Sequence, residues 1–158
     1  APGLDCSILS QTLHIQGWRP STESPIPISD PDSLIFKQKN AYFILTQQAY
    51  NDCLQWGDLA IAMAGTATEQ FIGLGKPAIA IPGNGPQYNA GFAEAQSRLL
   101  GPSLTLVKQP SQVLPAIQSL LKNPDLLHEI AKNGTQRMGS AGAARRIAEC
   151  LQERLLNY

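Results

Sequence analysis

Short apolar runs alternate with glycine, proline and polar residues along this chain. The clearest run covers residues 59–64, between Asp58 and Gly65, and its length beside a turn signal is typical of a strand buried on both faces. A helical segment follows up to Gly75, and a second apolar run at 78–81 leads into a loop rich in glycine and proline. The pattern predicts two parallel strands joined by a helix. The turns after both strands then lie at the carboxyl edge of the sheet, where α/β proteins bind their ligands.

The rest of the chain also switches between strand and helix patterns. Further strands are expected at 34–36, 42–45 and 104–107, and helices at 5–18, 47–56, 86–100, after Pro110, from Pro124 and at the C-terminus. The first two of these strands form a hairpin around the polar residues between them. We therefore predict an α/β fold with a mostly parallel sheet, organised as one domain over residues 1–158.

Three of the expected helices carry predictions about their faces and ends. In the helix at 86–100, Phe92 and Leu99 are the candidates for the inner face. The helix that begins at Pro124 is expected to end at Asn133-Gly134, with the glycine as a left-handed C-cap. The C-terminal helix is expected to bury its apolar stripe, which consists of Ile147, Cys150, Leu151 and Leu155.

The charge balance disfavours a nucleic-acid partner. The chain has 12 basic and 12 acidic residues and zero net charge, whereas nucleic-acid-binding domains carry a basic surplus. No apolar stretch approaches the roughly 20 residues of a membrane span. Cys6, Cys53 and Cys150 are widely spaced, which indicates reduced thiols in a cytoplasmic protein and no metal site. The chain starts at Ala1 without a methionine, so we expect it to be a fragment of a longer protein.

The turn at Gly65 has chemistry suited to an anion. Glycine has no Cβ, so a ligand can come close to the backbone there. Thr66 and Thr68 can supply hydroxyl donors beside the unpaired N–H groups of the helix start, and these groups favour a phosphate or diphosphate. The alternative is that one of the threonines caps the helix and the glycine only makes the turn.

The chain from Leu45 to its end resembles the two-Rossmann (GT-B) glycosyltransferases. It is most similar to lipid-A-disaccharide synthase and its cyanobacterial relatives, and more distantly to the transferase that adds N-acetylglucosamine in peptidoglycan synthesis. The runs that carry the resemblance are Trp56-Gly57-Asp58, Gly-Thr-Ala-Thr-Glu-Gln at 65–70, Gly-Lys-Pro-Ala-Ile-Ala-Ile-Pro at 75–82, Gln-Tyr-Asn-Ala at 87–90, and residues 138–147. The resemblance implies a Rossmann-like three-layer sandwich that is most of a C-terminal nucleotide-sugar-binding domain, truncated at its N-terminus.

The resemblance also implies roles for individual residues toward a UDP-sugar donor. Backbone groups of Leu45, Thr46 and Gln47 would meet the uracil. The diphosphate would bind at Gly65, Thr66, Ala67 and Thr68. The sugar hydroxyls would be faced by Gly83, Asn84, Gly85, Gln87 and Asn89, of which the last two have an alternative as ordinary polar residues at a helix start.

The ribose position departs from the family pattern. The family has a glutamate there, seven residues before the proline of Gly-x-Pro, and in this chain that position is Gln70, with Glu69 one place earlier. A glutamine carbonyl accepts a hydrogen bond from a ribose hydroxyl without the added strength of a charge. Either Gln70 does this more weakly or Glu69 takes the role.

These roles imply the UDP-sugar half of an inverting, metal-independent glycosyltransferase that uses no cofactor. The catalytic base and the site for a glycolipid or other acceptor would belong to an N-terminal domain outside this chain. The chain alone is then expected to bind UDP and to turn over nothing. The full-length protein would be cytoplasmic, with peripheral membrane association. The alternatives are a UDP-N-acetylglucosamine 2-epimerase-like enzyme, which shares the architecture, and a non-catalytic nucleotide-binding or interaction module.

The family resemblance has a consequence for the sheet. In this family the strand at Asp58 has a neighbour that precedes Ala1, so in this chain its edge would be open. An open apolar edge favours pairing with another chain. We therefore expect a homodimer, or a rearranged sheet in which the strands at 34–45 cover the edge.

Overall fold

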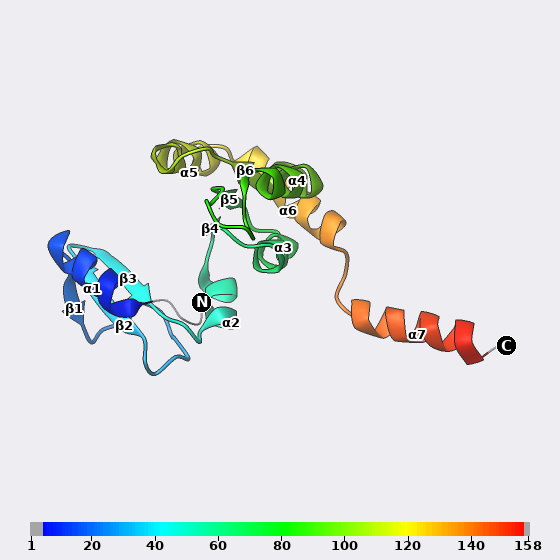
Figure 1. Cartoon of the computed structure of the whole chain (residues 1–158), viewed down its shortest axis with the longest axis horizontal. Helices are drawn as coiled ribbons and strands as arrows, with labels where there is room; N and C mark the ends of the chain where they lie inside the picture. Colours follow the sequence, from blue (N-terminus) through cyan, green and yellow to red (C-terminus); the bar gives the residue numbers. More distant parts are fainter. Residues whose placement is uncertain (1–4, 157–158) are drawn as a thin grey trace. The chain divides into compact units, whose positions relative to one another are not determined.

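Residues 5–156 are described by the computed structural model, in which the chain divides after Gly57 into two units (Figure 1). Unit 1 is Ala1–Gly57 and unit 2 is Asp58–Tyr158. The sequence predicts one nucleotide-sugar-binding domain over both.

Unit 1 contains a small antiparallel sheet with strand order β1-β2-β3. Its elements are α1 (Cys6–Ile15), β1 (Arg19–Ser21), β2 (Leu34–Gln38), β3 (Ala41–Leu45) and α2 (Tyr50–Trp56). The expected hairpin is confirmed, because β2 and β3 are antiparallel partners around a turn in which Lys39 has φ 54°. Helix α1 packs on this sheet, where the ring of His14 meets the edge of Phe36 at 5.7 Å between centroids.

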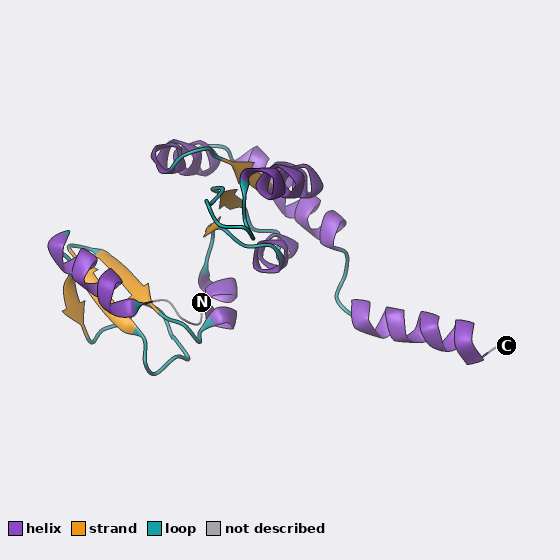
Figure 2. Ribbon diagram, in the orientation of Figure 1, coloured by secondary structure: helices purple, strands orange, loops and turns teal. Residues whose placement is uncertain are grey.

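Unit 2 contains a parallel sheet with strand order β4-β5-β6 and helices between the strands (Figure 2). Its elements are β4 (Ala60–Ala62), α3 (Thr66–Gly73), β5 (Ala78–Ala80), α4 (Ala90–Leu100), η1 (Gly101–Ser103), β6 (Leu104–Leu106), η2 (Pro110–Gln112), α5 (Val113–Leu121), α6 (Pro124–Met138) and α7 (Ala143–Leu156). The predicted α/β class is therefore confirmed, with a parallel sheet of three short strands.

The centre of unit 2 is β5, whose three residues are completely buried. Successive side chains of a strand point to opposite faces. Ala78 and Ala80 accordingly belong to a core cluster with Ile72 of α3, and Ile79 belongs to a second cluster with Leu120 of α5. Helices therefore cover both faces of this strand.

Strand β4 differs from its prediction as a strand buried on both faces. Ala60 packs against the core, but Ile61 is 56% exposed and Met63, just after the strand, is 55% exposed. The physical reason is that β4 is an edge strand, which pairs with β5 alone among the described residues. The expected alternative in which the strands at 34–45 join this sheet is wrong, since β1, β2 and β3 form a separate sheet.

The inner face of α4 lies at other residues than the sequence predicts. Phe92 and Leu99 are both exposed, whereas Ala93, Gln96 and Leu100 are buried. The buried residues recur at helical spacing, as expected of an amphipathic helix, but they lie on a different face of α4 from the predicted one. A small residue and a polar one occupy positions where the pattern favours large apolar side chains.

Helix α7 does not bury the stripe expected of it. Ile147, Leu151 and Leu155 are between 53% and 71% exposed, and Cys150 is exposed as well. Gly139 and Gly142, between α6 and α7, both have positive φ. No element in the described part of the chain covers the stripe, and this is why it stays exposed.

Helix α6 does not end at Gly134. The helix continues to Met138, and Gly134 is a buried residue in its interior. A Cβ built at Gly134 would lie 2.1 Å from the carbonyl oxygen of Ile72 in α3. The absent side chain therefore lets α6 approach the end of α3 closely, and tertiary packing accounts for this glycine.

This contact predicts the effect of adding one methyl group. Gly134→Ala is expected to lower the free energy of unfolding by about 3 kcal/mol or more, because the new Cβ meets backbone that cannot rotate away. The matched control is Gly91→Ala in α4, where the nearest heavy atom to a built Cβ is 3.5 Å away. That control should be neutral or stabilising by up to about 1 kcal/mol. Urea unfolding followed by circular dichroism measures both, and equal stabilities of the two variants would contradict the close approach.

Candidate functional site

The first predicted site segment is the start of α3, which has no side-chain cap. Its N-cap residue is Gly65, and no side chain makes a capping hydrogen bond there. Thr68 is buried, and its hydroxyl donates to the carbonyl oxygen of Ala64 at 2.6 Å. Thr66 is exposed. The alternative in which a threonine caps the helix is therefore wrong, and the first N–H groups of α3 keep their capacity to bind an anion.

The second segment is the loop after β5, which closes on itself. The backbone N–H of Gly83 donates to the carbonyl oxygen of Tyr88 at 2.8 Å. A Cβ at Gly83 would lie 2.9 Å from Cε of Met63, so the loop packs against the residues that follow β4. Asn84 and Gly85 are exposed. The structure thus brings the Gly83 loop beside the carboxyl end of β4, the strand that leads into the Gly65 turn.

Asn89 is a polar residue at a helix start, which is the alternative that the sequence offered to a contact with the sugar. It is the N-cap of α4, and its Oδ1 accepts from the backbone N–H of Phe92 at 3.0 Å. The cap uses the oxygen of the amide and leaves its NH2 group out of the bond. Gln87, two residues earlier, is exposed.

A buried glutamine links the two segments, and the sequence prediction missed it. The side chain of Gln96 is only 3% exposed. Its Nε2 donates to the carbonyl oxygen of Gly65 at 3.1 Å and lies 3.5 Å from Oε1 of Glu69, while its Oε1 accepts from the hydroxyl of Tyr88 at 2.9 Å. Burial raises the pKa of Tyr88, so the phenol keeps the proton that it donates. The signal that could have found Gln96 is its spacing with Ala93 on the inner face of α4.

The two candidates for the ribose position lie in different surroundings. Glu69 is half-buried and directs a carboxylate oxygen toward Gln96. Gln70 is exposed. Gln70 is therefore a solvent-exposed amide on α3, whereas Glu69 lies beside the buried amide of Gln96.

The three residues predicted for the uracil belong to unit 1. Leu45 is buried at the end of β3. The hydroxyl of Thr46 and the backbone N–H of Gln47 both donate to Oδ2 of Asp30, as does the N–H of Gln48. These three donors are therefore already used inside unit 1. The remaining predicted site residues all belong to unit 2.

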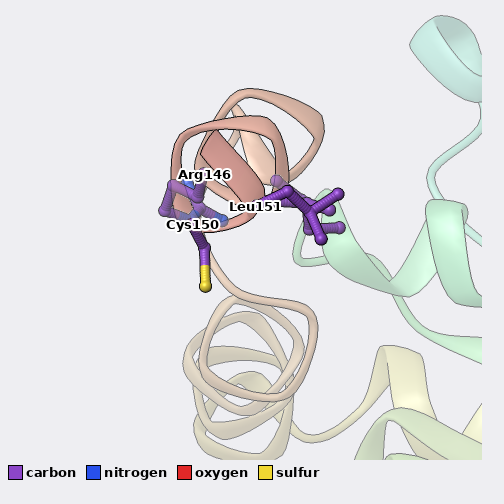
Figure 3. A pocket seen from close by; sticks show the side chains of 5 residues that line it. Arg146, Cys150 and Leu151 are labelled. Atoms are coloured by element: carbon purple, nitrogen blue, oxygen red, sulfur yellow. The ribbon is translucent and has the colours of Figure 1, made fainter. Parts of the chain in front are cut away.

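Other features of the described residues do not form an enclosed site. Within residues 5–156, no group of three or more His, Cys, Asp and Glu side chains is placed to hold a metal ion. The helices of the same residues all lack the length or apolar character needed to cross a bilayer. A hollow of about 320 Å³ lies along α7 (Figure 3) and is lined by Ala143, Arg146, Ile147, Cys150 and Leu151. One helix supplies that whole lining, so the hollow is a surface feature of α7.

Comparison of the chain with protein-family models, with curated proteins and with solved structures finds no match.

The carboxylate of Asp30 predicts a pH-dependent stability. The hydroxyl of Thr46, together with backbone N–H groups, holds the pKa of Asp30 below its ordinary value of 3.8. A carboxylate with a lowered native pKa stabilises the fold fully above the unfolded value, and this stabilisation is lost as the pH falls through the native pKa. Asp30→Asn should therefore cost stability at neutral pH, and the difference from wild type should shrink in acid below pH 3.8.

The measurement is urea unfolding at a series of pH values, followed by tryptophan fluorescence. Both tryptophans, Trp18 and Trp56, lie in unit 1. The matched control is Asp32→Asn, because Asp32 is exposed and its backbone N–H, not its carboxylate, bonds Asp30. If Asp30→Asn differs from wild type by the same amount at every pH, the ionised Asp30 is not what holds the 46–48 segment.

Proposed function

We propose that unit 2 binds the diphosphate of a UDP-sugar at the start of α3. The main support for this proposal is the uncapped N-terminus of α3 at Gly65. It follows β4 and lies near the loop that follows the parallel strand β5. Unpaired N–H groups and the helix dipole together stabilise negative charge at such a position. Thr66 adds an exposed hydroxyl beside them.

The loop after β5 suits an uncharged ligand such as a sugar. Residues 82–89 contain no charged side chain but offer amides at Asn84, Gln87 and Asn89. Amide groups donate to and accept from hydroxyl groups in a neutral hydrogen-bonded arrangement. In the proposal the sugar of the donor occupies this side and its diphosphate occupies the Gly65 side.

The reaction proposed for the full-length protein is inverting glycosyl transfer without a metal. An acceptor hydroxyl gives its proton to the catalytic base and attacks the anomeric carbon, the bond from that carbon to the diphosphate breaks, and UDP leaves with an added negative charge. The start of α3 stabilises that charge as it develops, which is the role of a preformed set of donors in a transition state. In this proposal the GT-B arrangement and the catalytic base require a domain that unit 2 does not contain.

The contact with the diphosphate can be tested at a single backbone N–H group, that of Thr66. Thr66 is the first residue of α3, where proline is tolerated because the N–H has no acceptor within the helix. Thr66→Pro should therefore keep the helix while removing one N–H donor to the diphosphate. The expected loss of UDP affinity is about 10- to 100-fold, the scale of one hydrogen bond to a charged group.

Thr66→Ala is the matched control, since it removes the exposed hydroxyl and keeps the N–H. Calorimetric titrations without metal, using UDP, UMP and ADP, give the affinities. We expect UDP to bind more tightly than UMP, because UMP lacks the second phosphate. Equal UDP affinity in Thr66→Pro and wild type would rule out the start of α3 as the diphosphate site.

If no nucleotide binds to wild type, a non-catalytic interaction module is the better proposal. Product analysis of the full-length protein separates a transferase from a 2-epimerase.

A fourth prediction concerns the ribose. If Gln70 accepts the ribose hydroxyls, Gln70→Glu should tighten UDP binding by about 1 kcal/mol, because a charged acceptor makes a stronger hydrogen bond. Glu69→Ala is the comparison, and it should leave the affinity within a factor of a few. A loss of binding in Glu69→Ala together with an unchanged Gln70→Glu would assign the ribose to Glu69. Calorimetry with UDP reads both variants.

A further inference from the structure

The amide of Gln96 connects both proposed binding segments of unit 2. On one side it donates to the carbonyl oxygen of Gly65, and on the other it accepts from the hydroxyl of Tyr88. Tyr88 in turn closes the loop through its carbonyl oxygen, which accepts from Gly83. A continuous series of hydrogen bonds therefore runs from the Gly65 turn through α4 to the Gly83 loop.

The orientation of the amide is determined by its neighbours. A carbonyl oxygen can only accept, so the group that faces the oxygen of Gly65 must be the NH2 of Gln96. The carboxylate of Glu69 lies on that same side, at 3.5 Å, and also requires a donor. The oxygen of the amide is left for the phenol of Tyr88, whose raised pKa keeps it protonated.

This orientation also directs the backbone N–H that would meet the diphosphate. The carbonyl oxygen of Gly65 accepts from Gln96 at 3.1 Å and from the N–H of Glu69 at 3.2 Å. In a planar trans peptide the C=O and the following N–H point in opposite directions. When the oxygen of Gly65 is held along the helix, the N–H of Thr66 points away from it, out of the start of α3.

The geometry points to Gln96 as the positioning residue that holds the Gly65–Thr66 peptide and the Gly83 loop in their ligand-binding arrangement. The inference rests on the proposed function in taking UDP as the ligand. Gln96 itself is buried beneath the two segments and acts through them, without touching the ligand.

The first test removes the amide and keeps the packing. Gln96→Leu should lower UDP affinity about tenfold or more, since the peptide plane and the loop both lose an anchor. Tyr88→Phe should give a smaller loss, because it frees only the oxygen end of the amide. The matched control is Leu100→Ala, one helical turn along the same buried face. That variant should lose stability through a cavity yet keep its UDP affinity, which separates a positioning role from a general effect on folding.

The second test uses a readout that packing alone would not change. In Gln96→Glu the ionised side chain cannot donate to Gly65, and it faces the carboxylate of Glu69 from α3 and the neutral phenol of Tyr88 from the loop. Once protonated, the introduced carboxyl can donate to Gly65 and accept from Tyr88 as the amide does. The ratio of variant to wild-type UDP affinity should therefore be low at alkaline pH and rise toward one as the pH falls.

The outcomes distinguish the inference from the proposed function. If wild type binds UDP and both Gln96 variants bind it equally well at every pH, the positioning role is overturned and the proposed function stands. If wild type does not bind UDP, the proposed function is overturned. Amide NMR spectra of the full chain without nucleotide provide a separate reading. Gln96→Leu should shift the signals of both Thr66 and Gly83, and a spectrum changed only around α4 would overturn the positioning role.

Discussion

A polar side chain in an apolar core has to find hydrogen-bonding partners, and in unit 2 this constraint falls on Gln96. Leaving its donors or acceptor unpaired would cost about 1–3 kcal/mol for each group. Both ends of the amide are hydrogen-bonded in the structure: the NH2 group donates to the carbonyl oxygen of Gly65, and the oxygen accepts from the hydroxyl of Tyr88. Because these partners lie in two different connections at the carboxyl edge of the sheet, satisfying one buried amide also orders the two segments of the candidate site.

Small residues set the distances in the rest of unit 2. The strands have three residues each, and the central strand buries two alanines that leave room for helices to approach. Gly134 extends the same principle to helix packing, since any side chain there would collide with the carbonyl oxygen of Ile72. Close packing of short elements keeps the start of α3 and the loop after β5 close to each other, so a narrow sheet is sufficient to support the site.

Two apolar surfaces remain without a partner in the described residues. One is the outer side of β4, where Ile61 and Met63 are more than half exposed, and the other is the stripe of α7 around Leu151. Exposed apolar side chains that gather on an edge strand or along a helix are typical of surfaces that become buried against another chain or domain. Met63 also lies against the Gly83 loop, so the exposed side of β4 borders the candidate site.

The sequence by itself determined the local elements: the hairpin of β2 and β3, the parallel strand–helix–strand unit, and the glycine turn at the start of α3. These follow from turn residues and from the spacing of apolar positions, which act between neighbours in the chain. Only the tertiary structure decided which face of α4 is buried, that Gly134 lies inside a helix, and that Asp30 takes the donors of residues 46–48. Periodicity predicts the spacing of a buried stripe, but when apolar residues lie on several sides it does not predict which side meets the core. A hydrogen bond such as that between Gln96 and Gly65, 31 residues apart, exists only because the fold brings its partners together.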